Sequence, residues 1–180
     1  MNDLSLEFRP TSLGWLAVVA SGAGLRWVSL AADHETLWPQ IARQFPDVPW
    51  QQADGANRFR NGRGVPSARF GGWMRTVEQA VERPARPGEA PFDISGTPFQ
   101  QSVWDALRGI PAGTVWTYGQ LAAHLGRPRA ARAAGSACGA NPIPFLIPCH
   151  RVIGSDGGLG GFGLGLDVKR ALLAREGVRC

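Results

Sequence analysis

The stretch TYGQLAAHLGRPRAARAAGSACGA, residues 117–140, contains the strongest fold signals in this sequence. Thr117 and Gln120 have the spacing of a capping box, in which two side chains satisfy backbone N–H groups at the start of a helix. This spacing predicts a helix that runs to Leu125 and is closed by the glycine after it. A proline then opens a second helix, expected over residues 129–140. Two short helices joined by a tight Gly-Arg-Pro turn predict a helix-turn-helix.

The second of these helices consists almost entirely of small residues. One of its faces, at spacings i, i+3, i+4 and i+7, contains Arg132, Gly135, Ser136 and Gly139. A helix that reads the major groove usually carries several long polar side chains, whereas a slender face with a single arginine suits close approach to the minor groove. The alternative is an alanine-rich helix buried against its neighbours.

Helix signals continue on both sides of this stretch. Thr97 and Gln100 form another capping box, with a proline in the first helical position, which predicts a helix to Arg108 that Gly109 ends. Apolar spacing near the end of the chain predicts a helix over residues 167–176.

The first half of the chain predicts a sheet with flanking helices. Short apolar runs separated by turn residues indicate an antiparallel meander. The loop over residues 54–72 is expected to be a solvated surface loop, and the alternative is an arm that contacts phosphate. The expected elements are strands over 4–8, 13–20 and 25–30, a helix over 35–45, a loop over 54–72, a helix over 73–82 and a linker over 83–91.

Charge is distributed unevenly along the 180 residues. Residues 1–93 contain 10 Arg against 10 Asp or Glu, a net charge of 0, whereas residues 94–180 contain 9 Lys or Arg against 4 Asp or Glu, a net charge of +5. Of the 19 basic residues, 18 are arginine, which suits forked hydrogen bonding to phosphate. A basic half beside a neutral half predicts a polyanionic partner, with nucleic acid as the first candidate.

Several classes of protein are excluded by composition. No apolar run approaches the roughly 18 residues of a membrane span, and the first ten residues predict no export signal. The three cysteines are odd in number and widely spaced, which argues against a disulfide framework and fits a reducing cytoplasm. Neither the cysteines nor the three histidines have paired ligand spacing, so no metal site is expected.

The segment Pro148-Cys149-His150-Arg151 is the candidate for chemistry. A thiol becomes a good nucleophile only as a thiolate, and a neighbouring histidine or arginine favours that form. The alternative is an inert buried cysteine beside a structural histidine. Cys138 and Cys180 are weaker candidates, the first as a small helix filler and the second as a chain end.

Three other features admit two interpretations. Tyr118, the only tyrosine, suits hydrogen bonding or stacking on a base as well as a core role, and Glu176 suits orienting a histidine as well as a surface position. Residues 158–163 match G-x-G-x-x-G, but they follow no βαβ unit and no acid lies about 20 residues on, so a dinucleotide site is rejected. A loop over residues 154–165 that closes over a ligand is expected instead.

Taken together, the motifs resemble the O6-alkylguanine-DNA alkyltransferase (methylated-DNA–protein-cysteine methyltransferase) family. The resemblance covers about residues 92–177. In chain order it contains GTPFQQSVW from Gly96, IPAG from Ile110, YGQLA from Tyr118, RAAG from Arg132, Asn141-Pro142, IPCHRVI from Ile147, and Lys169, Leu172, Leu173 and Glu176.

The resemblance implies a two-domain fold. Residues 1–91 would form an α/β domain, a small antiparallel sheet with flanking helices that is ribonuclease-H-like. Residues 92–180 would form a mainly α domain with a winged-helix-like helix-turn-helix, which binds DNA and transfers the alkyl group.

The resemblance also implies the reaction: single-turnover transfer of an O6-alkyl group, mainly methyl, from guanine in duplex DNA to Cys149, after minor-groove binding and base flipping. No cofactor would be required. Among the catalytic residues, Cys149 would accept the alkyl group, His150 would be its base through a water molecule, and Glu176 would orient His150. Tyr118 would donate to the flipped guanine, and Asn141 would brace the turn before the cysteine.

The remaining roles concern DNA and the pocket. Arg132 would fill the gap left in the duplex. Residues implied to contact DNA are Tyr118, Ala131, Arg132, Gly135, Ser136, Gly139 and Arg151; those implied to line the substrate pocket are Pro144, Val152, Phe162, Gly163 and Leu164. The protein would act in the cytoplasm, on the nucleoid, as a monomer without membrane attachment. O4-alkylthymine as a second substrate and cooperative assembly on DNA stay open.

This sequence departs from the family pattern in the loop after the cysteine. Members often carry a tyrosine, a small residue and two glycines where this chain has Phe162-Gly163-Leu164-Gly165. Loss of the phenol and added bulk at Leu164 predict good methyl transfer and poorer acceptance of benzyl groups.

Two other functions compete with this interpretation. A non-catalytic helix-turn-helix regulator would carry more long polar side chains on its second helix, and gives Cys149 no role. A cysteine-dependent hydrolase or thiol redox enzyme gives no reason for the basic half of the chain.

Overall fold

The computed structural model describes residues 3–53 and 57–179, so residues 54–56 of the expected loop and Cys180 lie outside it. The chain folds into two compact units. The first runs to Glu82 and includes Gly88–Ile94, and the second contains Arg83–Pro87 and the residues from Ser95 onward. The segment expected as a linker, 83–91, is therefore divided between the two units.

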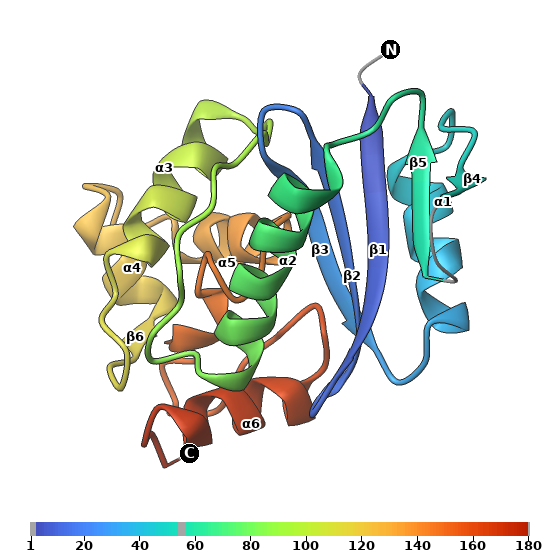
Figure 1. Cartoon of the computed structure of the whole chain (residues 1–180). Helices are drawn as coiled ribbons and strands as arrows, with labels where there is room; N and C mark the ends of the chain where they lie inside the picture. The colour runs from blue at the N-terminus through green and yellow to red at the C-terminus, as the bar shows by residue number, and fades with distance from the viewer. Residues whose placement is uncertain (1–2, 54–56, 180) are drawn as a thin grey trace. The chain divides into compact units, whose positions relative to one another are not determined.

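The first unit is built on one antiparallel sheet of order β3-β2-β1-β5-β4 (Figure 1). The strands are β1 Leu4–Thr11, β2 Gly14–Ser21, β3 Leu25–Ala31, β4 Gln51–Gln52 and β5 Arg58–Asn61. The predicted meander is confirmed, because β2 pairs antiparallel with both β1 and β3.

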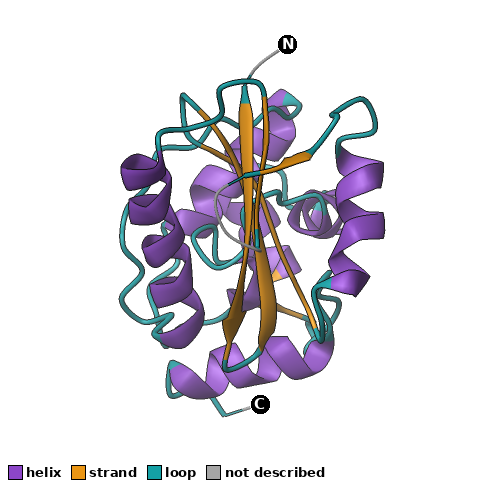
Figure 2. Ribbon diagram, turned by 45° about the vertical axis from the view of Figure 1, so that its right-hand side comes forward, coloured by secondary structure: helices purple, strands orange, loops and turns teal. Residues whose placement is uncertain are grey.

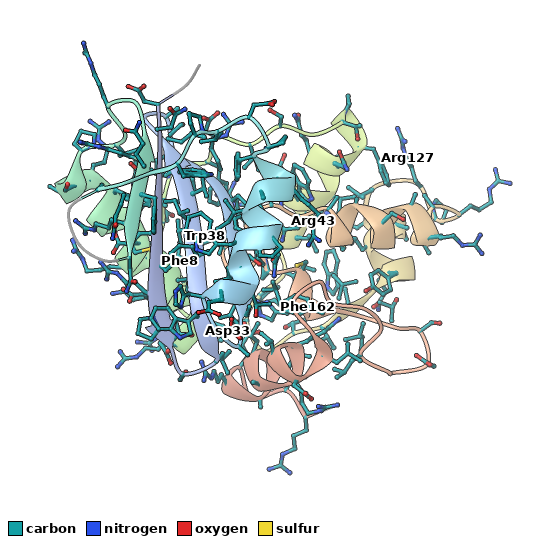
Figure 3. The ribbon with its side chains drawn as sticks, turned by 90° about the vertical axis from the view of Figure 1, so that its right-hand side faces the viewer. Phe8, Asp33, Trp38, Arg43, Arg127 and Phe162 are labelled. Carbon is teal, nitrogen blue, oxygen red and sulfur yellow. The ribbon has the colours of Figure 1, made fainter. Side chains whose placement is uncertain are left out.

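Two helices cover the sheet, which Figure 2 shows nearly edge-on between helices. Helix α1 is Trp38–Gln44, entered through a 3-10 turn, and helix α2 is Ser67–Glu82. Alternate side chains of a strand point to opposite faces. Phe8 accordingly packs edge-to-face on Trp38, with ring centroids 5.3 Å apart, whereas Arg9 pairs with Glu78 of α2 at 2.8 Å. Figure 3 labels Phe8 and Trp38 in this aromatic layer.

The prediction of a loop over residues 54–72 is wrong in part. Residues 58–61 form β5, whose partner is the open edge of β1, with Phe59 opposite Leu6. Helix α2 begins at Ser67 rather than at Trp73, although two glycines in a helix cost about 1 kcal/mol each. A buried face containing Phe70 and Met74 outweighs that cost.

The second unit is mainly helical and contains one short parallel pair of strands. Its elements are α3 Pro98–Arg108, β6 Trp116–Thr117, α4 Tyr118–His124, α5 Ala131–Gly139, a 3-10 turn Cys149–Arg151, β7 Val152–Ile153 and α6 Leu166–Arg175. Both predicted capping boxes are confirmed: the Thr97 and Thr117 hydroxyls accept from backbone N–H groups 3.2 and 3.1 Å away. The architecture is a small antiparallel sheet with helices followed by a helical unit.

Helix α5 is fixed by its neighbours. The indole of Trp104 on α3 donates to the carbonyl of Ala137 at 2.9 Å. Gly126, with φ of +70°, makes the turn after α4 in a conformation that residues with side chains rarely adopt.

Within the described part of the chain, no helix is long and apolar enough to cross a membrane.

Candidate active site

Cys149 is held at the end of a tight turn by Asn141. The Asn141 amide donates to the Ile147 carbonyl at 2.8 Å and to the Cys149 sulfur at 3.2 Å. Its side-chain oxygen accepts from the backbone N–H of Ile143 at 3.0 Å. One side chain therefore fixes both ends of the turn and the direction of the thiol.

The Cys149 thiol is almost enclosed, since the residue is 7% exposed. Burial raises the pKa of this thiol, while the hydrogen bond from Asn141 and the positive charge of Lys169 act in the opposite direction. The resting sulfur is consequently protonated at neutral pH and needs a base before it can act as a nucleophile.

The candidate for this base is His150, the next residue in the chain. His150 is fully buried, and its Nε2 lies 3.0 Å from Oε1 of Glu176, whose side chain is also enclosed. Burial opposes ionisation of Glu176, but hydrogen bonds from His150 and Arg151 outweigh it and lower the pKa of the carboxyl to about 2. An ionised carboxylate can only accept, so Nε2 of the neutral imidazole is the donor.

The other ring nitrogen of His150 is then an acceptor. Nδ1 is buried and has no hydrogen-bond partner among the described residues. Burial lowers the pKa of the imidazole and outweighs the opposite effect of Glu176. The lowered pKa favours the neutral imidazole at physiological pH. The residue next to the protonated thiol in the chain therefore carries a neutral imidazole with a free acceptor nitrogen.

A pocket of about 150 Å³ opens onto the thiol. Its lining residues are Tyr118, Gly135, Cys138, Gly139, Cys149, Gly161, Phe162 and Gly163. The Tyr118 hydroxyl donates to the carbonyl of Gly161 at 3.4 Å, and burial raises the pKa of the phenol, which keeps it a proton donor. Helix α4, helix α5, the cysteine turn and the loop before α6 thus meet at one concave site (Phe162 is labelled in Figure 3).

Three of the residues expected on the pocket wall are not among its lining. Pro144 and Val152 are buried in the core, where Val152 pairs with Trp116 between β7 and β6. Leu164 is half-buried outside this lining. Phe162 and Gly163 do line the pocket.

Helix α5 presents two different faces. Ala134, Ala137 and Cys138 are buried, whereas Arg132, Ser136 and Gly139 are exposed, and Ala131 and Gly135 are half-buried. One face of α5 is therefore buried against its neighbours, as the alternative expected, and the other face is exposed. Gly135 lies against the ring of Tyr118, where an added Cβ would sit 3.6 Å from two ring carbons.

The expectation that Arg151 contacts DNA is not met by its position. The residue is 4% exposed, and its guanidinium donates to Glu176 at 2.8 Å and to the carbonyl of Ile110 at 2.6 Å. A guanidinium used in this way cannot reach a phosphate without breaking these bonds.

Lys169 belongs to the site, although the sequence indicated no role for it. Its buried ammonium donates to the carbonyls of Val152 and Leu159, each at 2.5 Å, and to that of Gly161 at 3.3 Å. It therefore ties the pocket loop to β7. The sequence contained one signal for this role: Lys169 lies seven residues before Glu176, which places both residues on one face of a helix.

The described residues include no group of three or more His, Cys, Asp or Glu placed to hold a metal ion. The residues gathered here are suited to nucleophilic transfer: a thiol, a base, a carboxylate that orients the base, and a phenol facing the same pocket.

Comparisons with known proteins agree with this chemistry. A family model described as 6-O-methylguanine DNA methyltransferase, DNA binding domain, matches residues 98–178. The bifunctional transcriptional activator/DNA repair enzyme Ada of Escherichia coli (strain K12) is 38% identical over 164 residues, 91% of this chain and 43% of that protein. A methylated-DNA–protein-cysteine methyltransferase of Haemophilus influenzae is 36% identical over 176 residues, 98% of this chain and 88% of that protein.

A solved structure extends the likeness to three dimensions. Mycobacterium tuberculosis OGT, in a crystal structure in complex with DNA, matches with a TM-score of 0.70 and 31% identity, covering 95% of this chain and 91% of that one. The chain spans less than half the length of some relatives, namely 43% of the Escherichia coli protein and 48% of one from Salmonella typhimurium.

Proposed function

The chain belongs to the methylated-DNA–protein-cysteine methyltransferase family, and we propose on that basis that it repairs DNA by moving the O6-alkyl group of guanine onto its own Cys149. The observation that carries the proposal is the Cys149 thiol, which Asn141 holds in the lining of a pocket and which precedes His150, the partner of the buried Glu176. The proposed reaction requires no cofactor, since the acceptor is part of the protein.

The proposed reaction is a direct displacement at the alkyl carbon. His150 takes the thiol proton through a water molecule, and the thiolate attacks the carbon attached to O6. The sulfur–carbon bond forms as the carbon–oxygen bond breaks, and guanine leaves with the electron pair. Tyr118 hydrogen-bonds or protonates the departing base. The thioether product has no bond that water readily cleaves, so each molecule acts once.

The proposed substrate is a base rotated out of duplex DNA. Rotation costs a few kcal/mol, less for a mispaired alkylguanine. The exposed face of α5 would lie along the minor groove, with Arg132 in the space that the base vacates and Gly135, Ser136 and Gly139 allowing close approach. The place of action would be the nucleoid.

The finer architecture is also a proposal. Residues 92–180 would form the DNA-binding and alkyl-transfer domain, with α4 and α5 as a winged-helix-like helix-turn-helix. Residues 1–91 would form a ribonuclease-H-like domain. The likeness to the Mycobacterium tuberculosis structure covers 95% of this chain, so it includes both units.

Arg132→Ala is expected to slow repair of duplex DNA by about 10- to 100-fold. Without the arginine side chain, nothing fills the space left by the rotated base, so the free energy of unstacking that base is no longer offset. Transfer from free O6-methylguanine is expected to change by less than about threefold, since no stack has to be opened. Single-turnover rates on both substrates check this, with Arg170→Ala, an exposed arginine of α6, as the control. Equal losses on both substrates would contradict the role of Arg132.

Benzyl transfer is expected to be about 10- to 100-fold slower than methyl transfer, the range that a poor fit in an apolar pocket produces. The reason is the Phe162–Gly163 wall, which lacks the family's phenol. Parallel rate measurements on O6-methylguanine and O6-benzylguanine oligonucleotides test this expectation. Comparable rates would contradict it.

One experiment separates the proposed function from its rivals. The protein is incubated with an oligonucleotide containing O6-methylguanine and its intact mass is measured. A gain of one methylene per molecule supports alkyl transfer. Binding without a mass gain indicates a regulator, and repeated turnover of a small ester indicates a hydrolase.

A further inference from the structure

Arg151 is a buried cation whose hydrogen bonds all remain inside the protein. Its side chain is 5% exposed. Nη2 donates to Oε1 of Glu176 at 2.8 Å, and Nε lies 3.1 Å from Oε2 of the same carboxylate. Nη1 donates to the carbonyl of Ile110 at 2.6 Å, and Nη2 also donates to the carbonyl of Pro84 at 3.1 Å. Most of its five N–H donors are thereby used.

We propose that Arg151 is a positioning residue of the alkyl-transfer site, which holds the Glu176 carboxylate in the orientation that presents Oε1 to His150. The inference rests on the proposed function, because it assigns Arg151 to the base of that reaction. The role acts through Glu176: Arg151 is not among the residues that line the pocket, and its side chain donates to Glu176 and to two backbone carbonyls.

The geometry leaves the carboxylate one orientation. Oε1 accepts from Arg151 and from Nε2 of His150, which is 3.0 Å away. Oε2 accepts from Arg151 and from the backbone N–H of Gly113 at 3.2 Å. Because a guanidinium is planar and forked, two bonds to one carboxylate fix its plane as well as its distance. The carbonyls of Ile110 and Pro84 hold the guanidinium group itself in place.

Arg151 also balances the charge near the imidazole. The charged groups that act on His150 are Glu176 at the end of α6, Arg151 in the same turn and Lys169 on α6, with the Cys149 thiol adjacent in the chain. Glu176 favours the imidazolium, whereas Arg151 and Lys169 disfavour it. Removing Arg151 leaves the negative charge of Glu176 less compensated, so the pKa of His150 rises.

The direction of the resulting pH effect follows from the role of a base. Only neutral imidazole can accept the thiol proton, so a higher imidazole pKa moves the acid side of the rate profile to higher pH. A lysine at this position would keep the positive charge and lose the fork. Arg151→Lys is therefore expected to fall between the wild type and Arg151→Met.

The test compares wild type, Arg151→Met, Arg151→Lys and the control Arg170→Met. Two quantities are measured between about pH 5 and pH 9: the imidazole titration of His150 by NMR, without DNA, and the single-turnover rate of methyl transfer from an O6-methylguanine duplex. In Arg151→Met both midpoints are expected to rise by about one pH unit, with a rate about tenfold lower on the acid side of the profile, a smaller loss at neutral pH and rates that converge at high pH. Arg170→Met is expected to match the wild type.

The proposal is overturned if the Arg151 variants lose rate by the same factor at every pH while the His150 midpoint stays in place, as a purely structural role predicts. If Arg151→Met does not fold, the His150 midpoint of Arg151→Lys decides by the same criterion. The titration needs no substrate, so it tests the positioning role even if the wild type transfers no methyl group, which is the separate failure of the proposed function.

Discussion

Cys149→Ser is expected to abolish methyl transfer and to leave DNA binding within about twofold of the wild type. Serine has nearly the same shape and can still accept the hydrogen bond that Asn141 gives to the sulfur. Its hydroxyl is far harder to ionise than a thiol, so the neighbouring imidazole cannot generate the nucleophile. The proposed DNA contacts lie on the exposed face of α5, which this substitution does not touch.

Two measurements check this expectation: intact mass after incubation with an O6-methylguanine duplex, and fluorescence anisotropy with the same duplex. Cys138→Ser is the informative companion variant, because Cys138 lines the same pocket. Burial and the adjacent Cys149 raise the pKa of the Cys138 thiol to about 12. It is therefore not a competent nucleophile at neutral pH, and Cys138→Ser is expected to retain measurable transfer. Transfer that survives in Cys149→Ser would refute the assignment of the acceptor.

His150→Asn is expected to slow methyl transfer by about 10²- to 10⁴-fold at neutral pH, the usual contribution of a positioned general base. The Cys149 thiol has a raised pKa, so without the imidazole it ionises only as hydroxide increases. The variant rate should consequently climb about tenfold per pH unit above neutrality, while the wild-type rate levels off once the imidazole is neutral.

The measurement is a pH series of single-turnover rates. His124→Asn is the matched control: His124 ends α4 and packs at a tilt against Trp116 with centroids 4.9 Å apart, and it is not among the residues that line the pocket. It is expected to behave as the wild type. A His150 variant with a wild-type profile would show that another group takes the proton.

Local signals in the sequence predicted the parts of the fold that depend on near neighbours. The capping boxes at Thr97 and Thr117 involve residues three apart, so their outcome did not depend on tertiary structure. Strand β5 was missed for the opposite reason. Its residues, RFRN, do not alternate clearly, and they form a strand only because β1, more than fifty residues earlier, offers them an open edge.

The candidate site divides in the same way. Cys149 and His150 are adjacent in the chain and their motif is distinctive, whereas the partners of Glu176 are not visible locally. Arg151 was expected to contact DNA because the resemblance implied it. Its burial depends on a carboxylate 25 residues later and on carbonyls 41 and 67 residues earlier. Spacing along one chain does not reveal such contacts.

The Cys149 sulfur is the atom proposed to receive the alkyl group. The most direct test uses a duplex with a deuterated methyl group at O6 of one guanine, followed by proteolysis and mass spectrometry of every cysteine-containing peptide. The prediction is one labelled methyl per protein molecule, all of it on the peptide that contains Cys149, with no further uptake when fresh duplex is added. Label on the Cys138 peptide, or methanol released with continued turnover, would contradict the account.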